Sequence, residues 1–338
     1  MIEPTEFLRV SYSSLNTHSS CERKFEFNKL YPRKAGANSS YAGDVGTALH
    51  KGYQDYLIHG DETRALWAMA ESYPYELEFY QDKEDRNLEA CTSTLIEMIE
   101  SSALDEYELA TIVRPLTDAE KIDLNLAQAE GRLLDYTEAG RIIPAIEVPF
   151  EIRFKNLVLP DGRGIAFVGF MDAIMRHKWN DQYLTMDIKT HRRTLKDATA
   201  SYLYSAQQVP YGIMIEHILG KPVELFDVLY YDCFVDLMNP RATPYQYEKD
   251  STDIQEWLTN TVLTMQRIQQ SMEMDYFPRT GGGCLSFNSA CYFLDICQSR
   301  NRKMVEAYLL EGEEPAPSRY EVPWILAEID VFRGQADA

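Results

Sequence analysis

The sequence predicts an α/β protein with a central mixed β-sheet, helices on both faces of the sheet and a large helical insertion. Three observations lead to this prediction. Residues 145–189 alternate apolar and polar side chains with a period of two, which is typical of strands. Residues 251–272 place apolar side chains at helical spacing. Residues 225–231 form an apolar run of strand length after a helical stretch, and such a crossover favours a parallel pair within a mixed sheet.

The N-terminal part, residues 1–60, is predicted to consist of helices of the core. Residues 11–21 resemble a short capped helix, with Ser13 as the expected N-cap. A second helix is expected to start after Gly43 and to run through Leu57.

Residues 61–140 are predicted to form the helical insertion, which is strongly acidic. Residues 61–150 hold 21 acidic and 7 basic side chains, whereas residues 151–205 hold 6 acidic and 9 basic ones. The acidic excess behind the net charge of −20 therefore lies outside residues 151–205. Charge runs of this kind are usually solvated helix faces, and a locally neutral or basic wall is enough to bind phosphate.

The core, residues 141–275, is predicted to alternate strands and helices. Its expected elements, in chain order, are strands at 150–154, 165–174 and 182–189, a helix at 201–219, a strand at 225–231 and a helix at 251–272. Pro210 is expected either to kink the helix at 201–219 or to lie near the first turn of that helix. Residues 276–338 form a C-terminal segment with cysteines and a tail.

Length and composition set further bounds. The chain has 338 residues, of which 45% are hydrophobic, so one elaborated domain or two coupled domains are expected. The sequence has no basic-then-apolar leader and no apolar run long enough for a membrane helix, so we expect a cytoplasmic protein without membrane contact. Disulfides are rare in that compartment, which leaves the six cysteines free, catalytic or bound to metal.

The candidate site begins with Asp187 and Lys189, which share one strand face because they lie two residues apart. Asp172 ends the preceding apolar strand. Two carboxylates at such positions can hold Mg²⁺, and a neighbouring ammonium can position or deprotonate water. The alternatives are carboxylates in solvated turns and a simple salt bridge of Lys189 with one of them.

Four further residues complete the candidate site. The Ile188 carbonyl is a candidate metal ligand, and His50 can add a neutral imidazole that favours Mn²⁺ beside Mg²⁺. Gln207 and Tyr211 are four residues apart, so they share a helix face from which they can contact phosphate oxygens or orient Lys189. The alternatives are a surface histidine and packing of Tyr211 against the sheet.

These residues together resemble the PD-(D/E)XK nuclease superfamily in its RecB-like branch. That family has a helix histidine, then Gly-x-x-Asp, Asp-x-Lys and Gln-x-x-x-Tyr. The corresponding stretches here, in the same order, are Gly46–His50, Gly169–Asp172, Asp187–Lys189 and Gln207–Tyr211. The resemblance covers residues 11–60 and 145–300, and it implies a restriction-endonuclease-like core.

The cysteines extend the resemblance. Some RecB-like nucleases, including CRISPR-associated exonucleases, hold a 4Fe–4S cluster with one early and three late cysteines, as Cys21, Cys284, Cys291 and Cys297 are arranged. Six residues separate Cys284 from Cys291 where the family often has two, and Glu22 follows Cys21 where the family often has proline. Bound zinc or simple buried thiols remain alternatives.

The function expected from these features is a Mg²⁺- or Mn²⁺-dependent DNA exonuclease. The resemblance implies that it acts on single-stranded or end-containing DNA, in recombination, repair or phage DNA metabolism. Since the chain has no P-loop, unwinding would require a helicase or recombination partner. The alternatives are a catalytically inactive DNA-binding or complex-forming subunit on the same fold, and a zinc-stapled structural protein.

Overall fold

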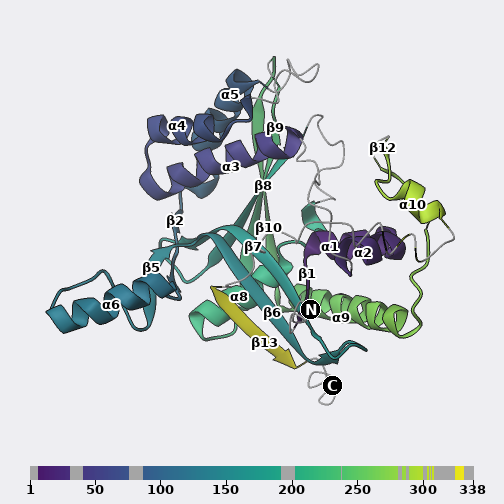
Figure 1. Cartoon of the computed structure of the whole chain (residues 1–338). Helices are drawn as coiled ribbons and strands as arrows, with labels where there is room; N and C mark the ends of the chain where they lie inside the picture. The colour runs from purple at the N-terminus through teal and green to yellow at the C-terminus, as the bar shows by residue number, and fades with distance from the viewer. Residues whose placement is uncertain are drawn as a thin grey trace. The chain divides into compact units, whose positions relative to one another are not determined.

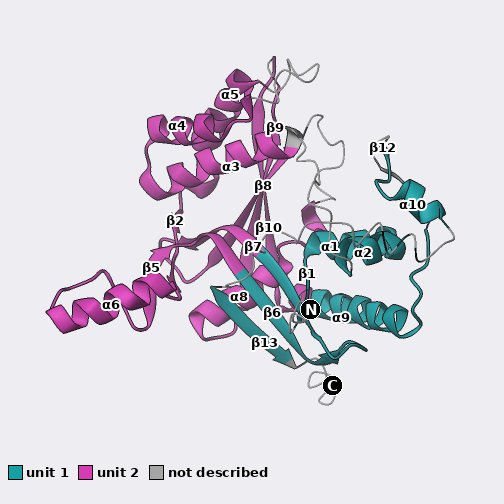
Figure 2. Ribbon diagram, in the orientation of Figure 1, with its two compact units in different colours: residues 1–38, 150–169, 255–338 teal, residues 39–149, 170–254 magenta. Residues whose placement is uncertain are grey.

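The computed structural model describes residues 7–30, 41–75, 87–191, 202–236, 238–280, 284–286, 289–299, 303, 305, 307 and 324–330. The chain divides into two compact units (Figures 1 and 2). Unit 1 comprises Met1–Asn38, Phe150–Gly169 and Gln255–Ala338, and unit 2 comprises Ser39–Pro149 and Phe170–Ile254. The divisions fall inside strands β6 (Ile146–Val158) and β7 (Gly164–His177), so each of these strands contributes residues to both units.

Unit 2 contains a mixed sheet. Its strands are the second half of β7, then β8 (Tyr183–His191), β9 (Leu225–Phe234) and β10 (Arg241–Asp250). β8 is antiparallel to β7 and parallel to β9, while β10 returns antiparallel to β9. A parallel pair needs a crossover, which includes helix α8 (Val209–Leu219). The mixed α/β class predicted from the sequence is confirmed.

Helices α3 (Tyr41–His59), α4 (Glu62–Ser72) and α5 (Leu88–Ile99) build the main core of unit 2 against the sheet. The buried cluster joins Leu49 of α3 and Leu95 of α5 to Met186 and Ile188 of β8. The even-numbered residues of β8 therefore face apolar helices. The odd-numbered residues, including Asp187, point to the opposite side of the strand.

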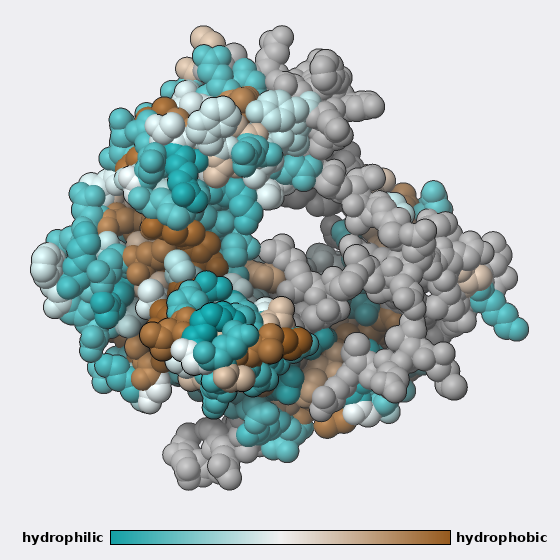
Figure 3. Space-filling model, turned by 60° about the vertical axis from the view of Figure 1, so that its left-hand side comes forward, coloured by the Kyte–Doolittle hydropathy of each residue, from teal (hydrophilic) through white to brown (hydrophobic). Residues whose placement is uncertain are grey.

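Residues 102–144 differ from the helical expectation for 61–140. They contain a 3₁₀ turn, four short strands and one helix: η3 (Ser102–Leu104), β2 (Tyr107–Leu109), β3 (Thr111–Arg114), α6 (Asp118–Glu130), β4 (Tyr136–Thr137) and β5 (Gly140–Pro144). β-Branched residues explain the strands, because Ile112 and Val113 pair with Ile143 and Ile142 across β3 and β5. Large hydrophobic side chains stay exposed in this part: Val113, Ile122, Leu126, Leu133 and Ile142. Figure 3 turns the side of the molecule that bears α6 and β5 in Figure 1 forward, and hydrophobic surface is visible there.

Unit 1 holds two parallel strand pairs. β1 (Phe7–Val10) pairs with the first half of β7, and β13 (Ile325–Asp330) pairs with β6. Its described helices include α1 (Tyr12–Ser20), α2 (Glu22–Lys29), most of α9 (Ser251–Glu273) and α10 (Leu294–Gln298), and β11 (Leu285–Ser286) pairs with β12 (Ser289–Ala290). No helix in the described ranges combines the length and apolar character needed to cross a bilayer.

Two helix starts differ from the sequence expectations. Ser11, not Ser13, caps α1, because Ser11 and Ser14 form a reciprocal capping box. The helix expected at 201–219 is not continuous, because residues 204–208 are not helical and α8 begins only at Val209. Pro210 lies in its first turn, where a missing N–H costs nothing, which confirms one of the two expectations for this residue. Ser201 lies outside the described residues.

Candidate active site

All seven predicted site residues lie in unit 2, and β8 supplies the central pair. Asp187 is buried, and its Oδ2 lies 2.5 Å from Nζ of the half-buried Lys189. The two groups form a close, largely buried ion pair. Oδ2 has no other partner among the described residues, and a carboxylate oxygen has more than one lone pair, so it keeps capacity for a metal ion.

Gln207 bridges the two charged groups. Its Oε1 accepts a hydrogen bond from Nζ of Lys189 at 2.7 Å, and its Nε2 donates to Oδ1 of Asp187 at 3.1 Å. Gln207 precedes α8, so it does not share a helix face with Tyr211 as the spacing suggested. The amide thus fixes the positions of both charges from the loop before the helix.

Tyr211 lies in the first turn of α8 and is buried. Its hydroxyl donates to the backbone carbonyl of Phe170 at 2.9 Å, two residues before Asp172. Burial, together with the carboxylates of Asp187 and Asp172, raises the pKa of Tyr211 well above its usual value. The hydroxyl therefore stays protonated and ties α8 to the strand that bears Asp172.

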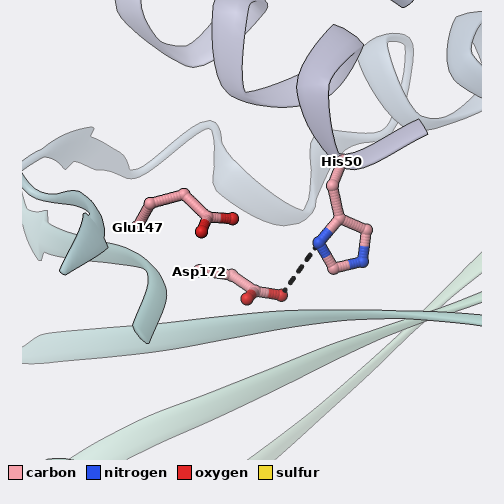
Figure 4. Close-up of side chains that lie close together, drawn as sticks. All are labelled: His50, Glu147 and Asp172. Atoms are coloured by element: carbon pink, nitrogen blue, oxygen red, sulfur yellow. Dashed lines mark ion pairs between the residues drawn. The ribbon is translucent and has the colours of Figure 1, made fainter. Parts of the chain in front are cut away.

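His50 on α3 meets Asp172 on β7 (Figure 4). Its Nδ1 lies 3.4 Å from Oδ2 of Asp172, and its Nε2 lies 2.9 Å from the carbonyl oxygen of Ile188. A carbonyl can only accept, so the second contact requires the proton on Nε2. When Nδ1 carries no proton, its lone pair faces the Asp172 carboxylate, which is the orientation needed to ligate a metal there.

Glu147 is a member of this cluster that sequence reasoning missed. Ligand atoms of His50, Glu147 and Asp172 all lie within 4.8 Å of one another, and Figure 4 shows the three side chains converging. Glu147 has a φ of 50°, which is uncommon outside glycine, and its Oε1 accepts from Nε2 of Gln54 at 2.8 Å. The sequence signal that could have indicated Glu147 is its position, as an acidic residue at the start of the alternating region 145–189.

The cluster has an excess of negative charge. Burial raises the pKa of the Asp172 carboxyl to about 7, and the carboxylates of Asp187 and Glu147 add to this rise, while His50 and Lys189 oppose it. A divalent cation would stabilise all three carboxylates in their charged form. Oxygen donors together with one imidazole suit Mg²⁺ or Mn²⁺, so the residues present fit such an ion.

Comparison with known families identifies the chain. Residues 9–298 match the family model of the PD-(D/E)XK nuclease superfamily. The chain belongs to this superfamily. By family it is therefore a metal-dependent nuclease, and nucleic acid is its substrate class.

Two solved structures similar to this superfamily member are distant. One is named "Putative exonuclease" from Eubacterium rectale, with 12% identity, coverage of 87% of this chain and 94% of that chain, and a TM-score of 0.42. The other is SSO0001, with 14% identity, coverage of 79% and 84%, and a TM-score of 0.22. A search of the curated proteins finds no match.

The four cysteines expected to ligate a cluster all lie in unit 1 of this nuclease. Within the described residues they do not form a group whose sulfur atoms lie within 4.8 Å of one another. They do share a neighbourhood. Cys291 and Cys297 pack against Phe27 and Phe293, and the backbone N–H of Cys291 donates to the carbonyl of Cys284 at 2.8 Å.

Two of these thiols have shifted pKa values. Burial raises the pKa of Cys21, but hydrogen bonds from the backbone of Thr280, Lys24 and Arg23 outweigh it, so the pKa is lowered overall. Burial raises the pKa of Cys297, and the thiols of Cys21 and Cys284 add to this rise. Cys21, Cys284 and Cys297 are therefore near enough to influence one another's charge.

Proposed function

We infer that the chain is a Mg²⁺- or Mn²⁺-dependent DNA exonuclease that acts on single-stranded DNA or DNA ends. The observation that supports this most is the convergence of four acidic or imidazole groups with one ammonium. His50, Glu147, Asp172 and Asp187 meet near Lys189, although they come from four separate elements. Phosphodiester hydrolysis needs such a set, because both the attacking water and the phosphate charge must be stabilised.

The metal would be held by the carboxylates of Asp172, Asp187 and Glu147 and by Nδ1 of His50. The Ile188 carbonyl accepts from Nε2, on the opposite edge of the ring from Nδ1, so it orients the imidazole; it could join the same ion as a ligand only by giving up this hydrogen bond. A bound divalent ion lowers the pKa of water and neutralises phosphate charge.

Lys189 acts beside these ligands as the fixed cation. Gln207 and Asp187 hold its ammonium from two directions, so the group is ordered before substrate arrives. It can donate a hydrogen bond to the attacking water or to a non-bridging phosphate oxygen. Tyr211 is a positioning residue, since its hydroxyl is bound to the Phe170 carbonyl.

Asp187→Asn should reduce DNA cleavage by at least about a thousandfold, since it removes a charge that binds the metal and orients Lys189. Asp181→Asn is the matched control, because Asp181 lies exposed in the turn before β8. Cleavage of labelled DNA is followed in Mg²⁺ and in Mn²⁺. Wild-type rates in Asp187→Asn would disprove the assignment of the site.

A separate assay tests whether cleavage requires a free DNA end. Linear single and double strands labelled at the 5′ or the 3′ terminus are compared with circular single-stranded DNA of equal length. An exonuclease degrades the linear forms and leaves the circle intact. Cleavage of the circle at the same rate would make the chain an endonuclease and would leave the metal site unaffected.

We propose further that Cys21, Cys284, Cys291 and Cys297 bind a 4Fe–4S cluster. Thiolates on one zinc ion lie about 4 Å apart, since each Zn–S bond is about 2.3 Å long. Cluster thiolates bind separate irons and so lie farther apart, which suits cysteines that share a neighbourhood without close contact. The lowered pKa of Cys21 also favours a thiolate ligand.

Anaerobic purification tests the cluster. The wild type and Cys91→Ala should contain iron and sulfide and absorb visible light, because Cys91 lies in the core of unit 2. Cys297→Ser should lose most of both. A colourless, zinc-loaded wild type would contradict the cluster and favour the zinc alternative.

A further inference from the structure

Unit 1 has a polar cavity lined by residues of helices α1 and α2, which follow one another in Figure 1 and contact each other. Its volume is about 470 Å³, and it is lined by Ser13, Ser14, Thr17, Lys24, Asn28 and Lys29. Within the described part of the chain, three hydroxyls, one amide and two ammonium groups make up this lining, without a carboxylate. That is unusual for a chain whose net charge is −20.

Helix geometry explains why these groups face one another. Lys24 and Asn28 are four residues apart on α2, as are Ser13 and Thr17 on α1, so each pair shares a helix face. The hydroxyl of Thr17 donates to the carbonyl of Ser13 at 2.9 Å, which holds the α1 side of the cavity in place.

The acids of α2 are neutralised elsewhere. Glu22 is buried and pairs with Arg267 of α9 at 2.7 Å, and Glu26 is buried and pairs with Arg23 at 2.8 Å. Neither glutamate lines the cavity. Among the described residues that line the cavity, the charged side chains are therefore Lys24 and Lys29, and both are positive.

This chemistry selects an anionic, hydrogen-bonding ligand. Apolar ligands are excluded, because pockets for them are lined mostly by hydrophobic side chains. Lysine, serine, threonine and asparagine are the side chains that contact nucleic-acid phosphates without reading sequence. A flexible ammonium binds phosphate as a point charge, without the fixed geometry of arginine.

We propose that the α1–α2 cavity binds the sugar-phosphate backbone of the substrate strand, at a site separate from the residues that bind metal. This inference rests on the proposed function for the choice of DNA as ligand. The cavity contributes affinity and no sequence preference. Lys24 and Lys29 each neutralise one phosphate.

Binding of a fluorescent single-stranded oligonucleotide to the full chain, in EDTA to prevent cleavage, tests this site. Lys24→Gln/Lys29→Gln should weaken binding about tenfold and make the slope of log affinity against log salt shallower by about 1.4, since each phosphate contact contributes about 0.7. Lys24→Arg/Lys29→Arg should restore both. Lys121→Gln/Lys155→Gln removes the same charge from exposed sites on α6 and β6 and should change the slope little.

Three outcomes would overturn the inference. The first is equal slopes for the two glutamine variants, and the second is no DNA binding by the wild type. The third is that Lys24→Gln/Lys29→Gln abolishes binding of inorganic phosphate or a mononucleotide but leaves oligonucleotide binding unchanged, which would make the cavity a small-anion site. If the wild type cleaves DNA and the slopes of the two glutamine variants are equal, the role of the cavity in DNA binding is refuted and the nuclease function stands. If DNA binding depends on Lys24 and Lys29 but no metal supports cleavage, the nuclease function is refuted and the role of the cavity stands.

Discussion

Asp172 shows how one residue can favour function over stability. Its side chain is 14% exposed and sits beside two other carboxylates, so ionising it in the metal-free protein is costly. Active sites commonly retain such unfavourable charges because a ligand later compensates them. The cost should be measurable as a dependence of stability on pH.

Asp172→Asn should therefore raise the melting temperature of the metal-free protein at pH 8. The native carboxyl keeps its proton up to about pH 7, whereas the unfolded chain releases it near its usual value of 3.8. The free energy of unfolding of the wild type thus falls as pH rises from about 4 to 7 and is level above, by about 1.4 kcal/mol for each unit of pKa difference. The asparagine variant should lack this fall.

Melting curves in EDTA at pH 5 and pH 8 measure the effect, and Mn²⁺ supplies the control. At pH 8 added Mn²⁺ should stabilise the wild type more than the variant, because ligand binding to the native state alone raises stability. An Asp172→Asn protein no more stable than wild type at pH 8 would refute the charge-excess explanation.

The residues that sequence reasoning could place are those with a fixed spacing. Asp187 and Lys189 share a strand face by alternation alone, and the structure brings them within 2.5 Å. Glu147 could not be placed, because its approach to His50 depends on a φ of 50° and on Gln54 from another element. Gln207 was placed on a helix, but Pro210 moves the helix start beyond it.

At the scale of elements, the position of α3 depends on close packing with its neighbours. Gly52 lies where a Cβ atom would approach Leu95 Cδ2 of α5 to 2.7 Å and Met69 Cβ of α4 to 2.8 Å. The helix can thus lie close to both others only without a side chain at this position. Since His50 is two residues away on α3, this packing also sets where the imidazole lies.

Gly52→Ala should destabilise the protein by about 1–3 kcal/mol, since overpacking outweighs the better helix propensity of alanine. Lys51→Ala, on the exposed side of the same helix, is the matched control and should be near neutral. Chemical denaturation measures both. An alanine at position 52 that stabilises the protein would mean that α4 or α5 moves away freely.

The strands, in contrast to the insertion, were largely foreseeable. β8 and β9 followed from apolar runs of strand length, and α9 from helical spacing over 251–272. β10 was missed because it is mostly polar, with Gln246, Lys249 and Asp250 among its residues. The strands within 102–144 were hidden by the acidic composition around them, which says little about backbone conformation.

At the scale of the whole molecule, the net charge and the local cations act on a DNA strand in opposite directions. A charge of −20 repels both itself and a DNA strand, whereas binding requires local cations such as Lys189 and those of the α1–α2 cavity. Raising the salt concentration from about 0.01 M to about 0.1 M shortens the screening length from about 30 Å to about 10 Å. Screening should therefore raise stability, by weakening self-repulsion, and lower DNA affinity, by weakening the attraction of the local cations.

We expect this salt step to raise the melting temperature by a few degrees and, in the same step, to lower the affinity for single-stranded DNA. A variant in which four exposed glutamates become glutamine, Glu62, Glu71, Glu97 and Glu256, has a charge of −16 instead of −20 and should gain less stability from salt. Parallel melting and binding titrations measure both quantities. If affinity rose with salt, repulsion by the whole chain would dominate, and local cations could not explain how so acidic a protein holds its substrate.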